Sequence, residues 1–235
     1  MIISSPPPYP VRDERDIYEQ LLPLEGADIL ELGYGKAEKT RAISQSGKAR
    51  SITALEVDEI QHTANLRSND LANVSFGLGG AEAIPAADES FDIVLMFKSL
   101  HHVPVERMDH ALAEICRVLK PGGLAYFSEP VFAGEFNEIL RLFHDEQAVR
   151  EAAFSALERA VVSGKFELAS ETFFSTPSHF ETFEHFEERI LNVTHTEHRL
   201  SPDLYQEVRE RFMRHMTPLG ADFATPLRVD LLRKP

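Results

Sequence analysis

The stretch Ile29-Leu30-Glu31-Leu32-Gly33-Tyr34-Gly35-Lys36-Ala37 joins an apolar run to a turn that contains two glycines. The run predicts a buried strand, and the helical periodicity that begins at Ala37 predicts a helix directly after the turn. Glycine adopts backbone conformations, and permits a close approach, that a Cβ would forbid. The turn therefore either only joins a strand to a helix or lies against a ligand.

The same alternation continues along the chain. Further apolar runs, typical of strands, occupy 51–57, 73–77, 91–97 and 123–129. Helical periodicity separates them, notably at 37–46, 59–69 and 105–119. Strands that alternate with helices predict a doubly wound, Rossmann-like α/β fold, whose parallel sheet carries helices on both faces. Such sheets bind ligands beyond the carboxyl ends of their strands, so chemistry is expected in those loops.

The last third of the chain has a different character, because 12 of the 16 phenylalanines follow residue 130. We predict a long helix over 134–162, a strand over 166–174, helices near 178–193 and 202–216, and a last strand over 223–232. These strands complete a seven-stranded sheet as an antiparallel edge, with a helical insertion between strands six and seven. The predicted organisation is an arm and helix that cover the site (1–24), a ligand-binding core (25–130) and a substrate-side lid (131–235).

Composition narrows the classes of function. The chain has 235 residues, 43% of them hydrophobic and 26% charged, as in ordinary globular proteins. Its formal net charge of -14 disfavours nucleic-acid and anionic-lipid partners. No apolar run approaches the roughly 18 residues of a membrane span, and the N-terminus does not have the pattern of a signal peptide. Cys116 is the single cysteine, which is compatible with a cytoplasmic location.

Two acidic positions indicate what kind of ligand the turn would hold. A dinucleotide site needs a third glycine at position 38, but Glu38 would place a carboxylate against the pyrophosphate, so NAD is disfavoured. Glu56 follows the glycines by about 20 residues, where a carboxylate accepts hydrogen bonds from ribose hydroxyls. The alternative for this region is a simple helix cap, a role that suits Asp58 better.

Several motifs follow one another along the chain. They are the E-x-G-x-G turn, Glu56, Gly80-Ala81-Glu82-Ala83-Ile84-Pro85, Phe91-Asp92-Ile93-Val94, Leu100-His101-His102-Val103 and Arg117-Val118-Leu119-Lys120-Pro121-Gly122-Gly123. Together they resemble the class I S-adenosylmethionine-dependent methyltransferases, in the small-molecule branch called type 11. The likeness covers about residues 25–130.

The resemblance implies an enzyme of the methyltransferase class that transfers a methyl group directly from S-adenosylmethionine to a small molecule and releases S-adenosylhomocysteine. Gly33, Tyr34 and Gly35 then match the turn beneath the cofactor, and Glu31 the acid that organises it. Further matches are Glu56 at the ribose, Val57 at the adenine, and Phe97 with Lys98 at the methionine part.

Two positions depart from the family pattern. Ala37 replaces the third glycine of the motif, and Gly80 replaces the Asp that usually accepts a hydrogen bond from the adenine amino group, immediately before Ala81 and Glu82. Glu82, a backbone carbonyl or water are the expected substitutes. Because one such bond contributes on the order of 1 kcal/mol, weaker cofactor binding is expected, and loss of activity does not have to follow.

Methyl transfer from a sulfonium requires alignment and, for some acceptors, removal of a proton. His101, His102 and Glu129 are the candidates for this role, each with a purely structural alternative. No metal ligand set is predicted: His195 and His198 could share one helix face, but no third ligand has a recognisable spacing. A non-catalytic sensor that binds the cofactor and an interaction module that has lost it stay open as alternatives. The sequence leaves the acceptor atom and the oligomeric state undetermined.

Overall fold

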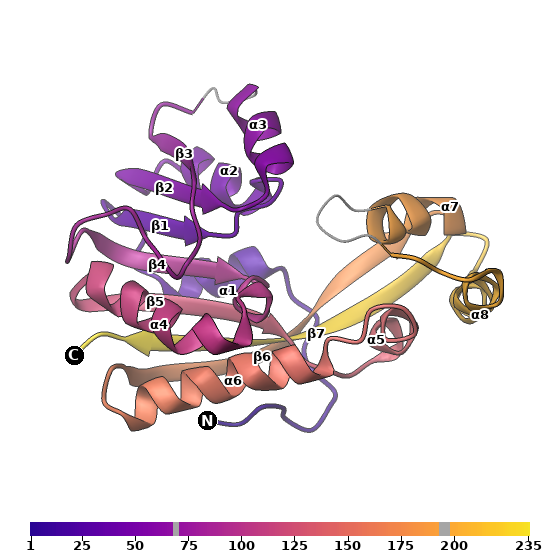
Figure 1. The fold of residues 1–235 in the computed structure, drawn as a ribbon. Coiled ribbons are helices and arrows are strands. Elements are labelled where there is room, and N and C mark those ends of the chain that lie inside the picture. Colours follow the sequence, from indigo (N-terminus) through magenta and orange to yellow (C-terminus); the bar gives the residue numbers. More distant parts are fainter. Residues whose placement is uncertain (68–70, 193–197) are drawn as a thin grey trace.

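A computed structural model describes residues 1–67, 71–192 and 198–235, and a single seven-stranded sheet forms its centre (Figure 1). The strands lie in the order β3-β2-β1-β4-β5-β7-β6, and β7 is antiparallel to both of its neighbours. Their bounds are β1 (Asp28–Leu32), β2 (Ser51–Glu56), β3 (Val74–Leu78), β4 (Phe91–Phe97), β5 (Leu119–Pro130), β6 (Glu167–Phe180) and β7 (Ala221–Arg233). This confirms the predicted fold class and the antiparallel last strand.

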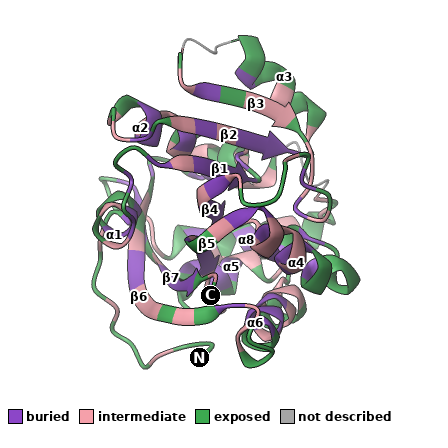
Figure 2. Cartoon of the chain, turned by 90° about the vertical axis from the view of Figure 1, so that its left-hand side faces the viewer, coloured by how far each residue is buried: buried purple, intermediate pink, exposed green. Residues whose placement is uncertain are grey.

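Helices cover both faces of the sheet, which explains why its central strands are almost continuously apolar. Alternate residues point to opposite faces of a strand. In β1, Leu30 packs with α4 (Met108–Val118) and α6 (Gln147–Val162), whereas Ile29 packs with α1 (Glu14–Leu21) and α2 (Glu38–Gln45). The remaining helix of this part, α3 (Glu59–Arg67), flanks β2 and β3. Figure 2 shows the buried middle strands between these layers.

A lobe extends beyond the sheet on the long β6–β7 hairpin (Figure 1). It holds α5 (Glu135–Leu140), α7 (Phe183–Phe186), the π-helix η3 (Glu187–Leu191) and α8 (Pro202–Met213). The predicted helical insertion between β6 and β7 is therefore present. Its phenylalanines form the core of the lobe, namely Phe136, Phe180, Phe183, Phe186, Phe212 and Phe223.

The predicted continuous helix over 134–162 is wrong, because the chain forms α5 and α6 with a break at 141–146. The physical reason is that the two halves belong to different cores. Ile139 packs in the lobe, whereas Leu157 packs against the sheet, so the chain has to turn between them. For a similar reason β6 runs past the predicted end at residue 174, since Phe180 belongs to the core of the lobe.

The N-terminal segment divides into two parts. The first residues run along the outer strands: the Ile2 amide donates to Glu171, Arg228 donates to the Ile3 carbonyl, and Tyr9 stacks on Phe173. The arm thus runs along β6 and β7, and its residues Ile3 and Ser4 reach the pocket beside Glu129 at the carboxyl end of β5. Among the residues that the structure describes, no helix combines the length and apolar character needed to cross a membrane.

Candidate functional site

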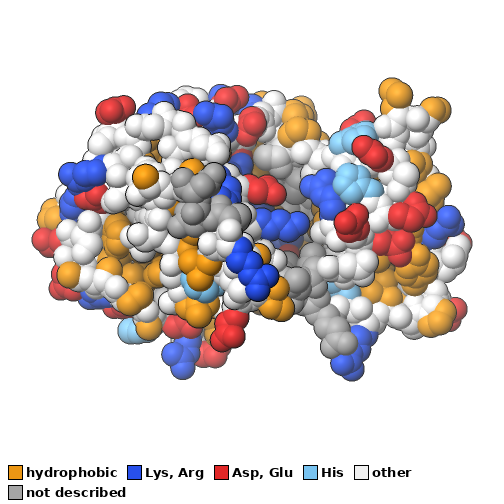
Figure 3. All heavy atoms as spheres, turned by 90° about the horizontal axis from the view of Figure 1, so that it is seen from above, with side chains coloured by type: hydrophobic (Ala, Val, Ile, Leu, Met, Phe, Trp, Pro, Cys, Tyr) orange, Lys and Arg blue, Asp and Glu red, His pale blue; other side chains and the backbone are white. Residues whose placement is uncertain are grey.

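The carboxyl ends of β1, β2 and β4 face the lobe, so the loops that follow them border the space between sheet and lobe (Figure 1). Figure 3 shows this region from above as a hollow, with Lys and Arg side chains on its rims. Ligands of open α/β sheets bind at this edge.

The glycine turn after β1 is built as the sequence predicts. Gly33 has φ +76°, and a Cβ placed on it would lie 2.7 Å from the Ser99 Cβ, so glycine is required for both conformation and space. Gly35 also has a positive φ of +51°, but nothing lies within 4 Å of the corresponding Cβ position. Ala37, the N-cap residue of α2, lies in the left-handed region with φ 57°, where the family has its third glycine. The open space is therefore above Gly35.

Glu31 supports this turn from below. Its carboxylate is buried and accepts a hydrogen bond of 2.6 Å from the Thr40 hydroxyl of α2. Burial is the main cause that raises the pKa of Glu31 to about 7; Thr40 and Lys39 lower it, while Glu56 raises it further. The residue ties β1 to α2 and does not itself reach the open space.

The raised pKa of Glu31 predicts a pH-dependent stability. The folded-state pKa of about 7 exceeds the ordinary value of 4.5, so folding favours the neutral carboxyl of Glu31. Its contribution to the stability of the fold is therefore fully present below pH 4.5 and is lost as the pH rises through 7. Glu31→Gln keeps the acceptor for Thr40 without a charge. Urea unfolding of both proteins at pH 5 and pH 8 tests this. From pH 5 to pH 8, the free energy of unfolding of the variant should rise relative to that of the parent protein by on the order of 3 kcal/mol. A difference that is the same at both pH values would contradict this.

Glu56 at the end of β2 is the acidic side chain that faces the turn. Its Oε2 accepts from the Gly35 amide at 2.7 Å, and its Oε1 accepts from the amides of Val57 and Asp58 at 2.8 and 3.0 Å. A carboxylate has about four acceptor positions, so one position on Oε2 is left for a ligand hydroxyl. Val57, next to it, is 69% exposed.

Glu82 occupies the space that an Asp at position 80 would use. A Cβ placed on Gly80 would lie 2.5 Å from Glu82 Oε2 and 3.2 Å from Oε1. The carboxylate of Glu82 therefore lies over Gly80, while the neighbouring Ala81 is buried in the core. The Glu82 carboxylate thus lies where the side chain of an Asp at position 80 would begin.

The remaining cofactor candidates lie around these groups. Tyr34 is buried, and its hydroxyl forms a 2.8 Å hydrogen bond with His62 Nδ1. Phe97 is half-buried against the rings of Tyr18 and Tyr126. Lys98 is exposed and has φ 54°, with its amide bonded to the Ser128 carbonyl.

A second cluster of polar side chains, made of His101, His102 and Glu129, lies at the ends of β4 and β5. His101 and His102, on the 3-10 helix η1 (Leu100–His102), have ring centroids 4.1 Å apart. Nδ1 of the buried His101 is hydrogen-bonded to Glu129 Oε2, and its Nε2 lies 3.6 Å from Glu146 Oε1. Glu129 Oε1 also accepts from the Leu100 amide at 2.9 Å. The structure thus brings all three catalytic candidates together.

The charge state of His101 follows from its two carboxylate neighbours. Burial lowers its pKa, but Glu129 and Glu146 outweigh this and raise the pKa to about 9. Burial alone would raise the pKa of Glu146, but His101 and Arg150 hold it well below its ordinary value. The two carboxylates therefore favour the charged imidazolium form of His101.

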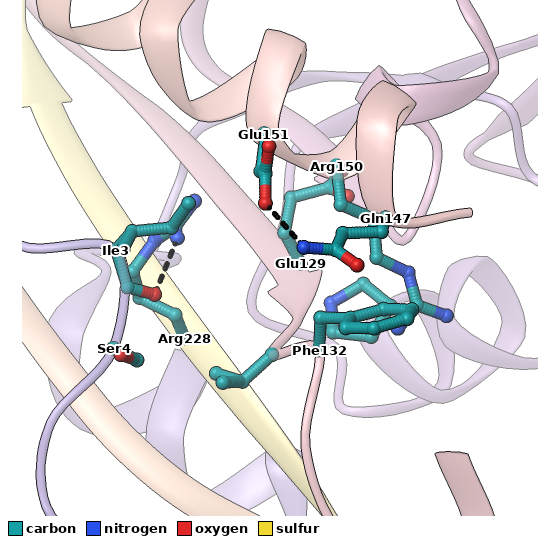
Figure 4. A pocket seen from close by; sticks show the side chains of 10 residues that line it. Ile3, Ser4, Glu129, Phe132, Gln147, Arg150, Glu151 and Arg228 are labelled. Atoms are coloured by element: carbon teal, nitrogen blue, oxygen red, sulfur yellow. Dashed lines mark hydrogen bonds between the residues drawn. The ribbon is translucent and has the colours of Figure 1, made fainter. Parts of the chain in front are cut away.

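A cavity of about 160 Å³ lies on the other side of Glu129 (Figure 4). Residues of the arm, of α6 and of β7 line it, including Ile3, Gln147, Arg150 and Arg228. Figure 4 shows Gln147 bonded to Glu151 and Arg228 bonded to the Ile3 carbonyl. None of the glycine-turn residues contributes to this cavity, so it is separate from the expected cofactor site.

Sequence reasoning missed His144 and Glu146, which join the second cluster from the break between α5 and α6. The incorrect continuous helix concealed them, and no proline or glycine marks the break. Of the histidines considered for a metal, His195 lies outside the described residues. His198 packs its ring 5.0 Å from the ring of His144.

Comparison with known proteins agrees with this geometry. A family model described as a methyltransferase domain matches residues 30–127, which contain β1 to β4, the glycine turn and most of β5. Over these residues, which are less than half of the chain, the protein is similar to a methyltransferase domain. A Bacillus halodurans protein assigned as a methyltransferase has a similar fold, with a TM-score of 0.64, 21% identity and coverage of 94% of this chain and 98% of that one.

Two curated methyltransferases are also similar to this chain. The malonyl-[acyl-carrier protein] O-methyltransferase of Methylococcus capsulatus is 36% identical over 104 residues, or 43% of this chain and 37% of that protein. The fatty-acid O-methyltransferase of Mycolicibacterium smegmatis is 30% identical over 106 residues, or 45% and 38% of the respective chains. The matched stretches thus span less than half of either relative.

Proposed function

We propose that this methyltransferase domain binds S-adenosylmethionine over the glycine turn and transfers its methyl group to a small molecule by direct displacement. The observation that carries the proposal is the Glu56 carboxylate, which the Gly35 amide fixes at 2.7 Å beside the open space above Gly35. A ribose hydroxyl would donate to the free position on Glu56 Oε2. Val57 would contact the adenine, and Phe97 with Lys98 would border the methionine part.

We further propose that the acceptor lies between this cofactor and the lobe, beside His101, His102 and Glu129. The sulfonium activates the methyl group, so these residues need only position the acceptor, and His102 or Glu129 would receive its proton if it has one. Residues 131–235 would supply the lid on this side. The named activities of the relatives, on a fatty acid and on malonyl-[acyl-carrier protein], support an acceptor oxygen on a small acyl compound.

We also propose a cytoplasmic location and a small-molecule partner. Cys116, the single cysteine, has its thiol near the Lys165 carbonyl, which fits a reducing cytoplasm. A net charge of -14 supports a small-molecule partner rather than a nucleic acid or an anionic membrane.

Calorimetric titration of the purified chain with S-adenosylmethionine and with S-adenosylhomocysteine tests the cofactor assignment. We expect one site with micromolar affinity for each. Absence of binding up to millimolar concentration would overturn the proposal and favour an interaction module. Binding without methyl transfer to any compound of an acyl-acid panel would favour a sensor instead.

Glu82 should replace the missing Asp at the adenine. We expect Glu82→Ala to weaken cofactor binding about tenfold, as for loss of a hydrogen bond to a charged group. Gly80→Asp alone should not improve binding, because its Cβ would meet Glu82 Oε2 at 2.5 Å and place two carboxylates together. The double variant Gly80→Asp/Glu82→Ala should bind more tightly than Glu82→Ala. If Glu82→Ala binds as the parent chain does, the adenine amino group is recognised by another group.

A further inference from the structure

Two histidine nitrogens converge on one carboxylate oxygen in the second cluster. Glu146 Oε1 lies 3.6 Å from His101 Nε2 and 2.9 Å from His144 Nε2. His101, His102 and Glu146 each offer a ligand atom, and these three atoms all lie within 4.8 Å of one another. The convergence joins two separate segments, the η1 helix after β4 and the break before α6.

We propose that His101, His102, His144 and Glu146 bind one divalent transition-metal ion of the zinc type. Imidazole nitrogen and carboxylate oxygen are the ligands that zinc takes in proteins, with four of them usual. Magnesium and calcium instead prefer sets made of oxygen alone. A site with three imidazoles therefore selects a transition metal.

Neighbouring side chains fix the directions of His101 and Glu146. Glu129 binds His101 Nδ1, which leaves Nε2 directed at Glu146, and the Leu100 amide in turn holds Glu129. Arg150 Nη2 donates to Glu146 Oε2 at 2.6 Å, so Oε1 is the oxygen that faces the histidines. A carboxylate on the second nitrogen of a ligating histidine is a usual feature of metal sites, because it fixes the ring and its tautomer.

The position of the cluster gives such an ion a role at the proposed acceptor side. It lies at the carboxyl ends of β4 and β5, where an ion would polarise an acceptor oxygen and lower its pKa. Metal binding itself does not depend on the cofactor or on methyl transfer. It can therefore be tested without either, and its failure would leave the methyltransferase proposal standing.

The test is calorimetric titration of the chelator-stripped full chain with zinc chloride, and in parallel with magnesium chloride. We expect one zinc ion per chain at micromolar affinity or better, and binding of magnesium at least about tenfold weaker. His144→Ala should weaken zinc binding by about tenfold or more, since it removes a ligand. His110→Ala, which removes an exposed histidine of α4 outside the cluster, should leave the affinity unchanged.

A second variant guards against a trivial loss of structure. Glu146→Gln keeps the shape of the side chain but removes its charge, and it should weaken zinc binding as His144→Ala does. Circular dichroism checks that each variant is folded; the His144 side chain is 35% exposed, so its removal is tolerable. Absence of saturable zinc binding, or equal affinity in the parent chain and the folded His144→Ala variant, would overturn the proposal.

Discussion

Replacing Glu56 by alanine should weaken binding of S-adenosylmethionine about 10- to 100-fold, the cost of losing a hydrogen bond to a charged group. Oε2 of this residue has the one free acceptor position, which the proposed ribose hydroxyl would use, and it also anchors the Gly35 amide. The change thus removes the ligand contact and frees the turn beneath it. Titration of the folded variant with the cofactor measures the effect.

Asp58→Asn is the matched control for Glu56→Ala. Asp58 lies two residues away, and its Oδ1 accepts from the Ile60 amide at 2.8 Å. Asparagine caps a helix as well as aspartate does, so this variant loses a nearby charge but keeps the local structure. Its affinity should stay within roughly twofold of the parent chain. If Glu56→Ala also binds normally, the cofactor site is elsewhere.

Replacing Glu129 by alanine should lower the free energy of unfolding by about 3–5 kcal/mol, the usual cost of removing one partner from a buried ion pair. Both His101 and Glu129 are at most 5% exposed. The variant would leave the His101 imidazolium with only Glu146, and the Leu100 amide without its acceptor. Urea unfolding at neutral pH with a chelator present measures this effect in the metal-free protein.

Two controls accompany this measurement. Glu129→Gln keeps an acceptor for the Leu100 amide, so it should cost less than the alanine variant. Glu135→Ala removes a carboxylate that also pairs with a histidine, His215, but is 77% exposed, and it should change stability by no more than about 0.5 kcal/mol. A loss below about 1 kcal/mol in Glu129→Ala would show that the pair is not a buried ion pair.

The core of the fold was predictable because the relevant information is local. The β4 strand has its predicted bounds, 91–97, because a strand buried on both faces is a short continuous apolar run between turn residues. The C-terminal part was less predictable. The helix pattern over 134–162 is continuous, yet the chain breaks it at 141–146 so that Ile139 and Leu157 can enter two different cores.

By itself the sequence determined the alternation of strands and helices, the glycine turn and the acid at the end of β2, because each depends on neighbouring residues and on backbone conformation. Only the tertiary structure decided which side chains meet. Glu82 lies over Gly80, and Glu146 reaches His101 across 45 positions of sequence, because the chain must turn between α5 and α6. Such contacts depend on how separate cores pack, and periodicity along the chain carries no information about that.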